Sequence, residues 1–581
     1  MPETLRGVAT GLFVAAIMII PSPSDAQVPA LASAGEKRQD TYSNIRRSDY
    51  VGPEVCGQCH EKNYSDWQKH PHSRMNMLAS DESVLGDFSG ASLSYGGRRA
   101  VFRKQEGAFI VEYFRGEKRI RKFKITRTIG WRYEQDYVGI QLQGPEPPND
   151  LLYTDETRLR FSYSLERKRW LPQSYLEPSE YPGSEYKDDG TLRHDPFVPE
   201  RVSFNKRCAW CHNTYPYDLR FYKIRTEDGT LSGFPPSPGA EPEVVEALAR
   251  QAGDLEISHE QAVPIDRLVT VGISCESCHF GGREHALEDK EIRFVPTHPL
   301  LARWTPDHKN ARKNPEVVNA ICRQCHSSGA NSPDNWPDGS AGVNSMESIE
   351  QDRGGCKSKL RCTHCHNTHR GGPDGGAPDR KKHLSACVDC HQKFQFVGAE
   401  SAHSHHLPSQ ASCLDCHMPR IVQGFAVYNR THRISSPTDE NILTTGMPNA
   451  CNLCHLDKSL AWTRNALETR WGKRIELPRA LQHHLGRAFE RPMGEAWLTH
   501  PFSLAGLVAA GAYTRSPLGG KILPLLLVFL NEPNAYNRLG FLQSVEKILG
   551  RKLSEQEFSL TGLPETRKKQ VQDLLKRYAR R

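Results

Sequence analysis

The pattern Cys-x-x-Cys-His occurs eight times in this chain and constrains the fold more than any other feature. Its residues are Cys56, Cys59, His60; Cys208, Cys211, His212; Cys275, Cys278, His279; Cys322, Cys325, His326; Cys362, Cys365, His366; Cys387, Cys390, His391; Cys413, Cys416, His417; and Cys451, Cys454, His455. This is the attachment motif of c-type haem, in which both thiols bond to the porphyrin and the His ligates the iron. We therefore expect eight covalently bound haems c.

The alternative for paired cysteines is a disulfide or zinc scaffold, but neither explains a His after every pair. The motifs use sixteen of the seventeen cysteines and leave Cys356. Cys356 is open to three interpretations, namely a buried bystander, an intermolecular disulfide or an unusual axial ligand, and we favour the bystander.

Haems that only transfer electrons need a sixth ligand, usually a second His. The chain has 25 His, so seventeen remain beyond the eight in the motifs. The expected distal ligands are His72, His285, His369, His403, His406 and His432, whereas His194, His259, His298, His308 and His383 stay open. If the stretch around His366 and His369 is helical, both lie on one face, so His369 is expected to reach a neighbouring haem.

The first residues predict export. Arg6 precedes an apolar run from Val8 to Ile20, and the small-residue site at Ser24-Asp25-Ala26 is typical of signal-peptide cleavage. That run is too short to span a bilayer, and no later segment is a better candidate, so no transmembrane span is expected in the mature chain. Haem attachment also requires export, which predicts a periplasmic location and leaves an outer-surface location open.

The charge balance does not indicate a nucleic-acid partner. The formal charge is +8, and removing residues 1–26, which hold one Arg and two acidic residues, makes it +9. Each ferric haem adds about −1, so eight haems bring the loaded chain to about +1 when oxidised and about −7 when reduced. The basic excess is expected to pair with haem propionates.

The motif spacing predicts the fold class. Between residues 208 and 455 a motif occurs about every 35 residues, which leaves little chain for an ordinary apolar core. Only 37% of the residues are hydrophobic. We expect a mainly α fold with extensive loops, organised around stacked haems whose porphyrin faces form the interior.

Two regions differ from this core. β-forming residues around turns at Glu106-Gly107 and Arg115-Gly116 predict a small antiparallel β insertion. After His455, helical periodicity predicts a helical region with a HEAT-like character but no firm repeat. The expected parts are a signal peptide at 1–26, a haem-one segment at 27–89, a β-rich insertion at 90–175, a multihaem core at 176–459 with haems two to eight, and a haem-free helical domain at 460–581.

The chain resembles the multihaem c-type cytochromes grouped with pentahaem nitrite reductase and octahaem hydroxylamine oxidoreductase. The matching stretches, within roughly residues 50–465, are Tyr50-Val-Gly before the first motif with Tyr64, Trp67 and His72; Gly272 to His279 with Gly282 and His285; Cys362 to His369; Cys413 to Pro419; His432-Arg-Ile; and Pro448 to His455 with Trp462. The resemblance implies two-His ligation using His72, His285, His369 and His432, with haems in parallel and perpendicular stacks. No Cys-x-x-Cys-Lys, the mark of the nitrite reductases' catalytic haem, occurs here.

The favoured function is electron carriage along closely spaced haems between respiratory partners, such as a quinol dehydrogenase or other cytochromes. The alternative is reduction of a small nitrogen or sulfur oxyanion, such as nitrite, hydroxylamine or tetrathionate, at one haem with an open distal site. Haem one is the first candidate for that site, with Lys124, Arg127, Arg132 and Tyr133 near it in sequence. The sequence assigns no catalytic residue and leaves open whether the chain is an enzyme, whether it forms a homo-oligomer, and whether it instead acts as a haem-redox sensory module through its helical tail.

Overall fold

The computed structural model describes ten segments of the chain, and all of them belong to one compact unit, Ser43–Arg581. The described residues are 43–177, 181–201, 203–222, 265–297, 308–327, 335–357, 359–370, 380–424, 428–476 and 489–578. The predicted signal peptide lies outside them, as do His259 and His298. No helix in these segments combines the length and the apolar character needed to cross a membrane. The predicted division at residues 89, 175 and 459 stays a prediction.

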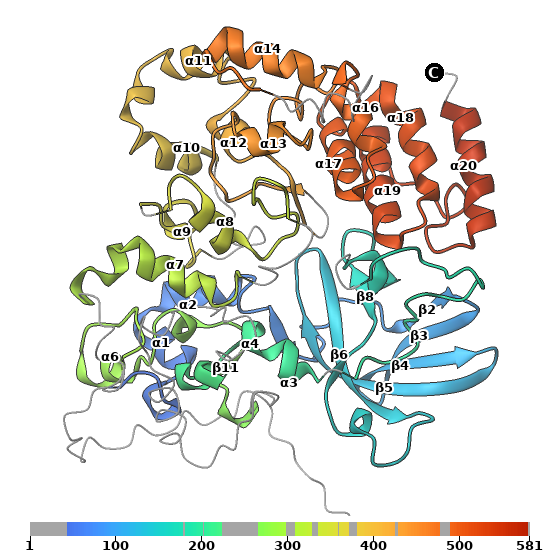
Figure 1. The fold of residues 1–581 in the computed structure, drawn as a ribbon. Helices are drawn as coiled ribbons and strands as arrows, with labels where there is room; N and C mark the ends of the chain where they lie inside the picture. Colours follow the sequence, from blue (N-terminus) through green and yellow to red (C-terminus); the bar gives the residue numbers. More distant parts are fainter. Residues whose placement is uncertain are drawn as a thin grey trace, which may run out of the picture. The chain divides into compact units, whose positions relative to one another are not determined.

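Short helices and turns carry the motif regions (Figure 1). The α-helices before residue 460 are α1 (Pro53–Cys59), α2 (Glu61–Gln68), α3 (Phe204–Arg207), α4 (Ala209–His212), α6 (Arg283–Glu288), α7 (Pro315–Arg323), α8 (Glu347–Arg353), α9 (Cys362–Cys365), α10 (Arg380–Val388), α11 (Ala399–Ser404), α12 (Cys413–His417) and α13 (Glu440–Leu443). The 3₁₀ helices within the described residues are η2 (Arg47–Asp49), η3 (Leu151–Tyr153), η4 (Gln173–Tyr175), η5 (Tyr217–Tyr222), η6 (Ile265–Arg267), η7 (Cys275–Ser277), η9 (His308–Lys313), η10 (Gln392–Gln395) and η12 (Phe529–Asn531). Two small two-stranded sheets pair β10 (Asn213–Thr214) with β11 (Thr270–Val271) and β12 (Val422–Gln423) with β13 (Tyr428–Asn429).

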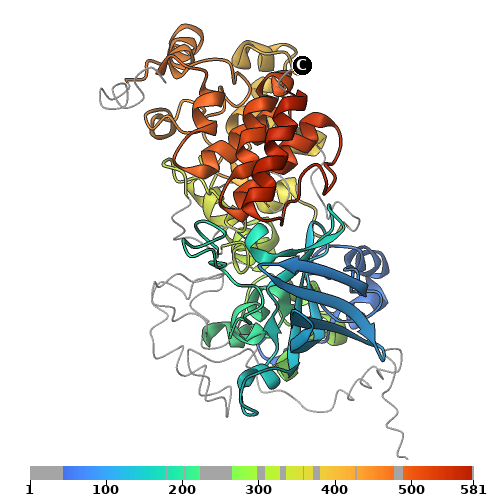
Figure 2. The same cartoon turned by 90° about the vertical axis from the view of Figure 1, so that its right-hand side faces the viewer.

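A nine-stranded antiparallel sheet corrects the expected fold class. Its strands are β1 (Asn76–Leu78), β2 (Ser89–Tyr95), β3 (Arg98–Gln105), β4 (Ala108–Arg115), β5 (Lys118–Ile129), β6 (Glu134–Gln143), β7 (Thr157–Arg158), β8 (Phe161–Ser164) and β9 (Arg169–Pro172). The order is β2-β3-β4-β5-β6-β8-β9, with β1 paired to β5 and β7 paired to β6 (Figures 1 and 2). A mainly α fold with a small β insertion is therefore wrong, because the sheet is extensive and begins within the segment predicted for haem one.

Some strands of this sheet were predicted from the sequence, and others were not. Glu106 and Gly107 both have positive φ, 50° and 79°, and form the predicted turn between β3 and β4. β4 has five consecutive buried residues, 109–113, but its flanking turns mark it, whereas β6, with five buried residues at 135–139, and β8, with all four residues buried, have no such clear turn signal. A strand covered on both faces shows no polar–apolar alternation, so periodicity did not identify β6 or β8.

The C-terminal region is helical, as predicted. Its helices are α14 (Leu460–Trp471), α16 (Met493–Leu498), α17 (Ser503–Tyr513), α18 (Gly519–Val528), α19 (Ala535–Leu549) and α20 (Pro564–Tyr578). α17 packs against α16 and α19, and α18 packs against α19 and α20 (Figure 1). One hydrophobic core includes residues of these helices and of the large sheet. The expectation that porphyrin faces alone form the interior is therefore wrong for these two regions, where ordinary side-chain burial stabilises the fold.

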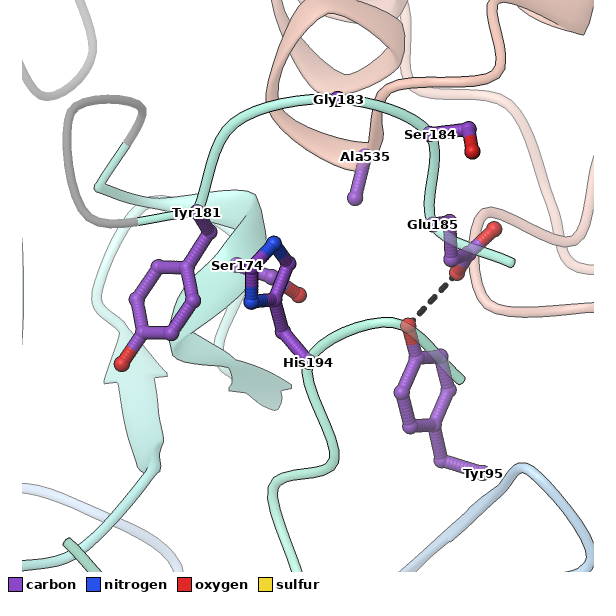
Figure 3. Close-up of a pocket in the computed structure, with 8 residues that line it drawn as sticks. All are labelled: Tyr95, Ser174, Tyr181, Gly183, Ser184, Glu185, His194 and Ala535. Carbon is purple, nitrogen blue, oxygen red and sulfur yellow. Dashed lines mark hydrogen bonds between the residues drawn. The ribbon is translucent and has the colours of Figure 1, made fainter. Parts of the chain in front are cut away.

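A buried carboxylate joins the sheet region to α19 and α20. Glu185 is 1% exposed in its side chain and accepts hydrogen bonds from Tyr95 (2.7 Å), Tyr175 (2.6 Å), Arg538 (2.8 Å) and Arg567 (3.1 Å). Figure 3 shows Glu185 beside Tyr95 at the edge of a small cavity lined by Ser174, Tyr181, Gly183, Ser184, His194 and Ala535. Because two donors come from the chain between the first and second motifs and two from the chain after the eighth, this network fixes the sheet against the C-terminal helices.

A cluster of three carboxylates, two of them in β6, has too little positive charge around it. The carboxylate oxygens of Glu134, Asp136 and Glu177 lie within 4.8 Å of one another. Arg158 is 2.6 Å from Glu177 and 3.5 Å from Asp136, but Oε2 of Glu134 is buried without a hydrogen-bond partner. Burial, reinforced by the negative charges of Asp136 and Glu177, holds the pKa of Glu134 well above its usual range.

Replacing Glu134 with glutamine is expected to stabilise the protein at pH 8 by about 1–3 kcal/mol, the usual cost of an unsatisfied buried polar group. Because the folded-state pKa of Glu134 is raised, the unchanged protein has its full stability below the unfolded-state pKa, near 4.5, and loses stability as the pH rises through the folded-state pKa. The gain from Glu134→Gln is therefore expected at pH 8 and not at pH 5. The measurement is the urea unfolding free energy of both proteins at pH 5 and pH 8. Equal pH dependence of Glu134→Gln and the unchanged protein would contradict this account.

Candidate functional site

Each motif forms one helical turn. The backbone N–H of the motif His donates to the carbonyl of the first Cys, as in His60 to Cys56 (2.9 Å) and His366 to Cys362 (2.9 Å). Equivalent bonds of 2.9–3.2 Å occur at His212, His279, His326, His391 and His455, and His417 ends helix α12. One turn brings the two sulfurs to the same side of the helix. None of the seventeen cysteines forms a disulfide, so all motif sulfurs are available.

Six motif imidazoles face a second imidazole from a distant part of the chain. The ring centroids are 6.1 Å apart for His60–His285, 6.0 Å for His279–His369, 6.2 Å for His366–His432, 6.2 Å for His417–His403, 6.0 Å for His455–His406 and 6.5 Å for His326–His72. The second member of each pair is one of the six histidines expected as distal ligands. The rings are near parallel in four pairs, at 5–22°, and inclined at 43° and 60° in the last two.

These separations fit iron held between two imidazoles. A metal–imidazole bond is about 2 Å long, and the ring centroid lies roughly 1 Å behind the nitrogen. Two ligands on opposite sides of one metal therefore place their centroids about 6 Å apart. All six pairs have this spacing, and a motif turn with two sulfurs lies beside each pair. The residues present thus suit haem c with two axial His.

The pairing also shows which motif each distal histidine serves. His369 follows the fifth motif but faces His279 of the third, and His285 follows the third motif but faces His60 of the first. His403 faces His417 of the seventh motif, and His406 faces His455 of the eighth. The facing rings therefore often come from segments next to a different motif, which brings neighbouring motifs close together.

Two motif histidines have no such pair among the described residues. Among the imidazoles whose side chains the structure describes, none faces His212 or His391, and the open candidate His308 lies outside that set. The open candidate His383 lies 6.4 Å from His366 and nearly perpendicular to it, at 72°. His194 contacts Tyr181 and the carbonyl of Pro182 near the large sheet instead.

Hydrogen bonds orient the rings for metal binding. Nδ1 of His285 contacts the carbonyl of Lys290 (2.6 Å), Nδ1 of His406 that of Ser404 (2.6 Å), and Nδ1 of His417 that of Ser435 (2.8 Å). Nδ1 of His326 contacts the Glu347 carboxylate (3.1 Å). A proton engaged at Nδ1 leaves Nε2 free to ligate a metal.

The local environment favours the neutral, ligand form of several imidazoles. Burial lowers the pKa of His72 to about 3 and the pKa values of His279 and His366 to about 4, and nearby imidazoles act in the same direction. A neutral imidazole keeps the lone pair that a metal needs.

Contacts between motif cysteines place the motifs in a continuous series. Hydrogen bonds join Cys56 to Cys275, Cys322 to Cys362 and Cys387 to Cys413. Further motif residues lie near one another, namely Cys278 and Cys322, Cys365 and Cys387, Cys416 and Cys451, and Cys211 and His326. A thioether has no such proton, so what matters for the loaded protein is the closeness of the sulfurs. The motif order in space is one, three, four, five, six, seven, eight, with motif two beside motif four.

Glu276 of the third motif also fixes the first. Its buried carboxylate accepts N–H groups of Val51 (3.1 Å), Gly52 (2.8 Å) and Gly282 (2.8 Å). Gly52 precedes the helix of motif one, and Gly282 precedes the helix that carries His285. One side chain therefore positions both members of the His60–His285 pair.

Replacing Glu276 with glutamine is expected to lower the free energy of unfolding by about 1–3 kcal/mol, because one amide oxygen cannot accept all three N–H groups. Thermal and urea unfolding followed by far-UV circular dichroism measure the loss. Glu288→Gln is the control, since the side chain of Glu288 is 54% exposed. Equal stability of the two variants would exclude the clamp.

The geometry around the first motif does not favour the open distal site that was considered for haem one. His285 faces His60 at the position that a substrate would need. Arg127 is buried and paired with Glu156 (2.8 Å), and Arg132 lies over Tyr133.

Cys356 lies near Cys387 and Cys390 of the sixth motif, a proximity that the sequence did not suggest.

Comparisons with known proteins agree with this chemistry. Residues 399–497 match the family described as cytochrome c552, and residues 55–86 match cytochrome c554 and c-prime. No curated protein matches the chain. A solved structure, the outer cell wall cytochrome OcwA, is 13% identical and aligns over 90% of this chain and 100% of its own, with a TM-score of 0.41, which is too low to support an argument. The motifs and the two family matches support a multihaem c-type cytochrome with covalently bound haem c.

Proposed function

We propose that this protein is an exported octahaem cytochrome that carries electrons along a continuous row of haems between redox partner proteins. The observation that carries the proposal is the set of six imidazole pairs, together with the cysteine contacts that link all eight motifs. Haem c, when bound, supplies one-electron redox chemistry at each motif. Electron transfer is the role that the family matches also suggest.

The chain's own residues favour carriage over catalysis at six motifs. The paired imidazoles at these motifs would hold the metal of a bound haem from both sides and would leave no position for a substrate. Rings held by hydrogen bonds at Nδ1 and by burial keep their positions whatever the charge of the metal. Such rigidity lowers the rearrangement that accompanies each electron. A membrane quinol dehydrogenase or another cytochrome is the proposed class of partner, and the predicted signal peptide supports a periplasmic or outer-surface location.

A second candidate function has one specific observation in its favour. His212 and His391 face no imidazole among the described side chains, so a haem at either motif is the place to look for an open distal position. There the alternative, reduction of a small nitrogen or sulfur oxyanion, would operate.

The test is expression in a host that matures c-type cytochromes, followed by a pyridine haemochrome count and CO titration of the reduced protein. Eight haems per chain, with at least six that are low-spin and bind no CO, is the expected result. A count well below eight overturns the octahaem proposal. CO or nitrite binding at one or two haems favours the reductase function, whereas none at any haem removes it.

A further inference from the structure

The hydrogen bonds at Nδ1 of the paired imidazoles are of two chemical kinds. His285, His406 and His417 contact neutral backbone carbonyls. His326 contacts a carboxylate oxygen, Oε2 of Glu347, at 3.1 Å. One other paired imidazole has a carboxylate near Nδ1, since Oε2 of Glu350 lies 3.8 Å from Nδ1 of His432, but that distance is too long for a hydrogen bond.

Local structure holds Glu347 in this position. It is the first residue of α8, and its other oxygen, Oε1, accepts the backbone N–H of Ser345 at 3.0 Å. The next residue, Ser348, donates from its hydroxyl (2.7 Å) and its N–H (3.2 Å) to the carbonyl of His326. The start of α8 therefore holds both the backbone and the ring of His326.

A carboxylate affects an axial imidazole more strongly than a carbonyl does. It draws the Nδ1 proton toward itself and makes Nε2 a more basic ligand. Its negative charge also favours the oxidised metal, which has one more positive charge than the reduced metal. Both effects act in one direction, toward a more negative reduction potential.

The motif of His326 lies between two groups of motifs, so its reduction potential affects electron transfer between them. Cys322 of this motif lies near Cys278 of motif three and is hydrogen-bonded to Cys362 of motif five, and His326 itself lies near Cys211 of motif two. Motif four is thus the junction between motifs one to three and motifs five to eight.

We propose that Glu347 is a positioning residue that gives the haem at His326 a more negative potential than the haems at His60, His417 and His455, and so makes it the energetic barrier at this junction. The inference rests on the proposed function, because it requires haem at the fourth motif. Electrons that pass between the two sides of the row must occupy this site, so its potential governs their rate.

The experiment is an optical and EPR-monitored redox titration of the loaded protein and of Glu347→Gln, which keeps an acceptor and removes the charge. The expected result is a positive shift of one component with the amplitude of a single haem, and a change in a single low-spin ferric EPR signal. Glu316→Gln is the matched control, since Glu316 is an exposed carboxylate in the first turn of α7, which leads into the same motif. It is expected to leave the titration unchanged.

Glu347→Asp keeps the charge on a shorter side chain and is expected to give a smaller shift, which keeps the inference testable if Glu347→Gln folds poorly. Superimposable titrations of Glu347→Gln, Glu347→Asp and the unchanged protein at equal haem content overturn the inference. A common shift of all components overturns it too, because it would reflect the overall charge. Absence of haem from the motif-four peptide by mass spectrometry would instead count against the proposed function.

Discussion

Replacing Glu185 with alanine is expected to lower the free energy of unfolding by about 3–5 kcal/mol, the usual effect of removing one partner from a buried ion pair. The side chain of Arg538 is fully buried, and that of Arg567 is 4% exposed. Without Glu185, two guanidinium groups would be buried beside each other with no counter-charge. The hydroxyl of Tyr95 would also lose its acceptor, whereas that of Tyr175 would keep the carbonyl of Leu560 at 3.1 Å. Urea titration followed by far-UV circular dichroism measures the change.

The control for Glu185→Ala is a carboxylate in a solvent-exposed pair. Asp573 lies 3.0 Å from Lys576, and their side chains are 57% and 76% exposed. Asp573→Ala is expected to change stability by less than about 0.5 kcal/mol, because surface ion pairs contribute little. If both variants lost the same small amount, the Glu185 network would not be what fixes the sheet region to α19 and α20.

Replacing His369 with alanine is expected to convert one haem from low-spin to high-spin and to create one additional CO-binding site per chain. His369 lies 6.0 Å from His279 and only 11° from parallel to it. The alanine side chain cannot ligate a metal, so the axial position opposite His279 opens. The measurement is the optical spectrum of the reduced protein, with and without CO, compared with the unchanged protein.

The control for His369→Ala is His194→Ala, because His194 contacts Tyr181 and the Pro182 carbonyl and faces no motif histidine. Its CO titration is expected to equal that of the unchanged protein. If His369→Ala bound no extra CO at unchanged haem content, His369 would not be the sixth ligand at motif three. If neither variant changed the spectrum, the axial partner of His279 would be a residue other than His369.

Only some strands of the large sheet could be predicted from the periodicity of the sequence. β3, β4 and β5 were predictable because hairpin turns at Gly107 and Gly116 separate runs of β-forming residues. β6 and β8 were not, because burial on both faces removes alternation. The fold class was therefore wrong, because strands such as β6 and β8 left no periodic signal in the chain.

The sequence alone determined the haem chemistry, because two thiols and an imidazole within one helical turn form a local motif that no distant contact has to complete. It also supplied the candidate distal histidines as residue types. Only the tertiary structure decided which of them faces which motif, since His285 and His60, or His432 and His366, meet through chain folding and not through spacing. The carboxylate of Glu347 at His326 belongs to the same class, because a hydrogen bond between a motif turn and the start of α8 depends on packing that no local pattern records.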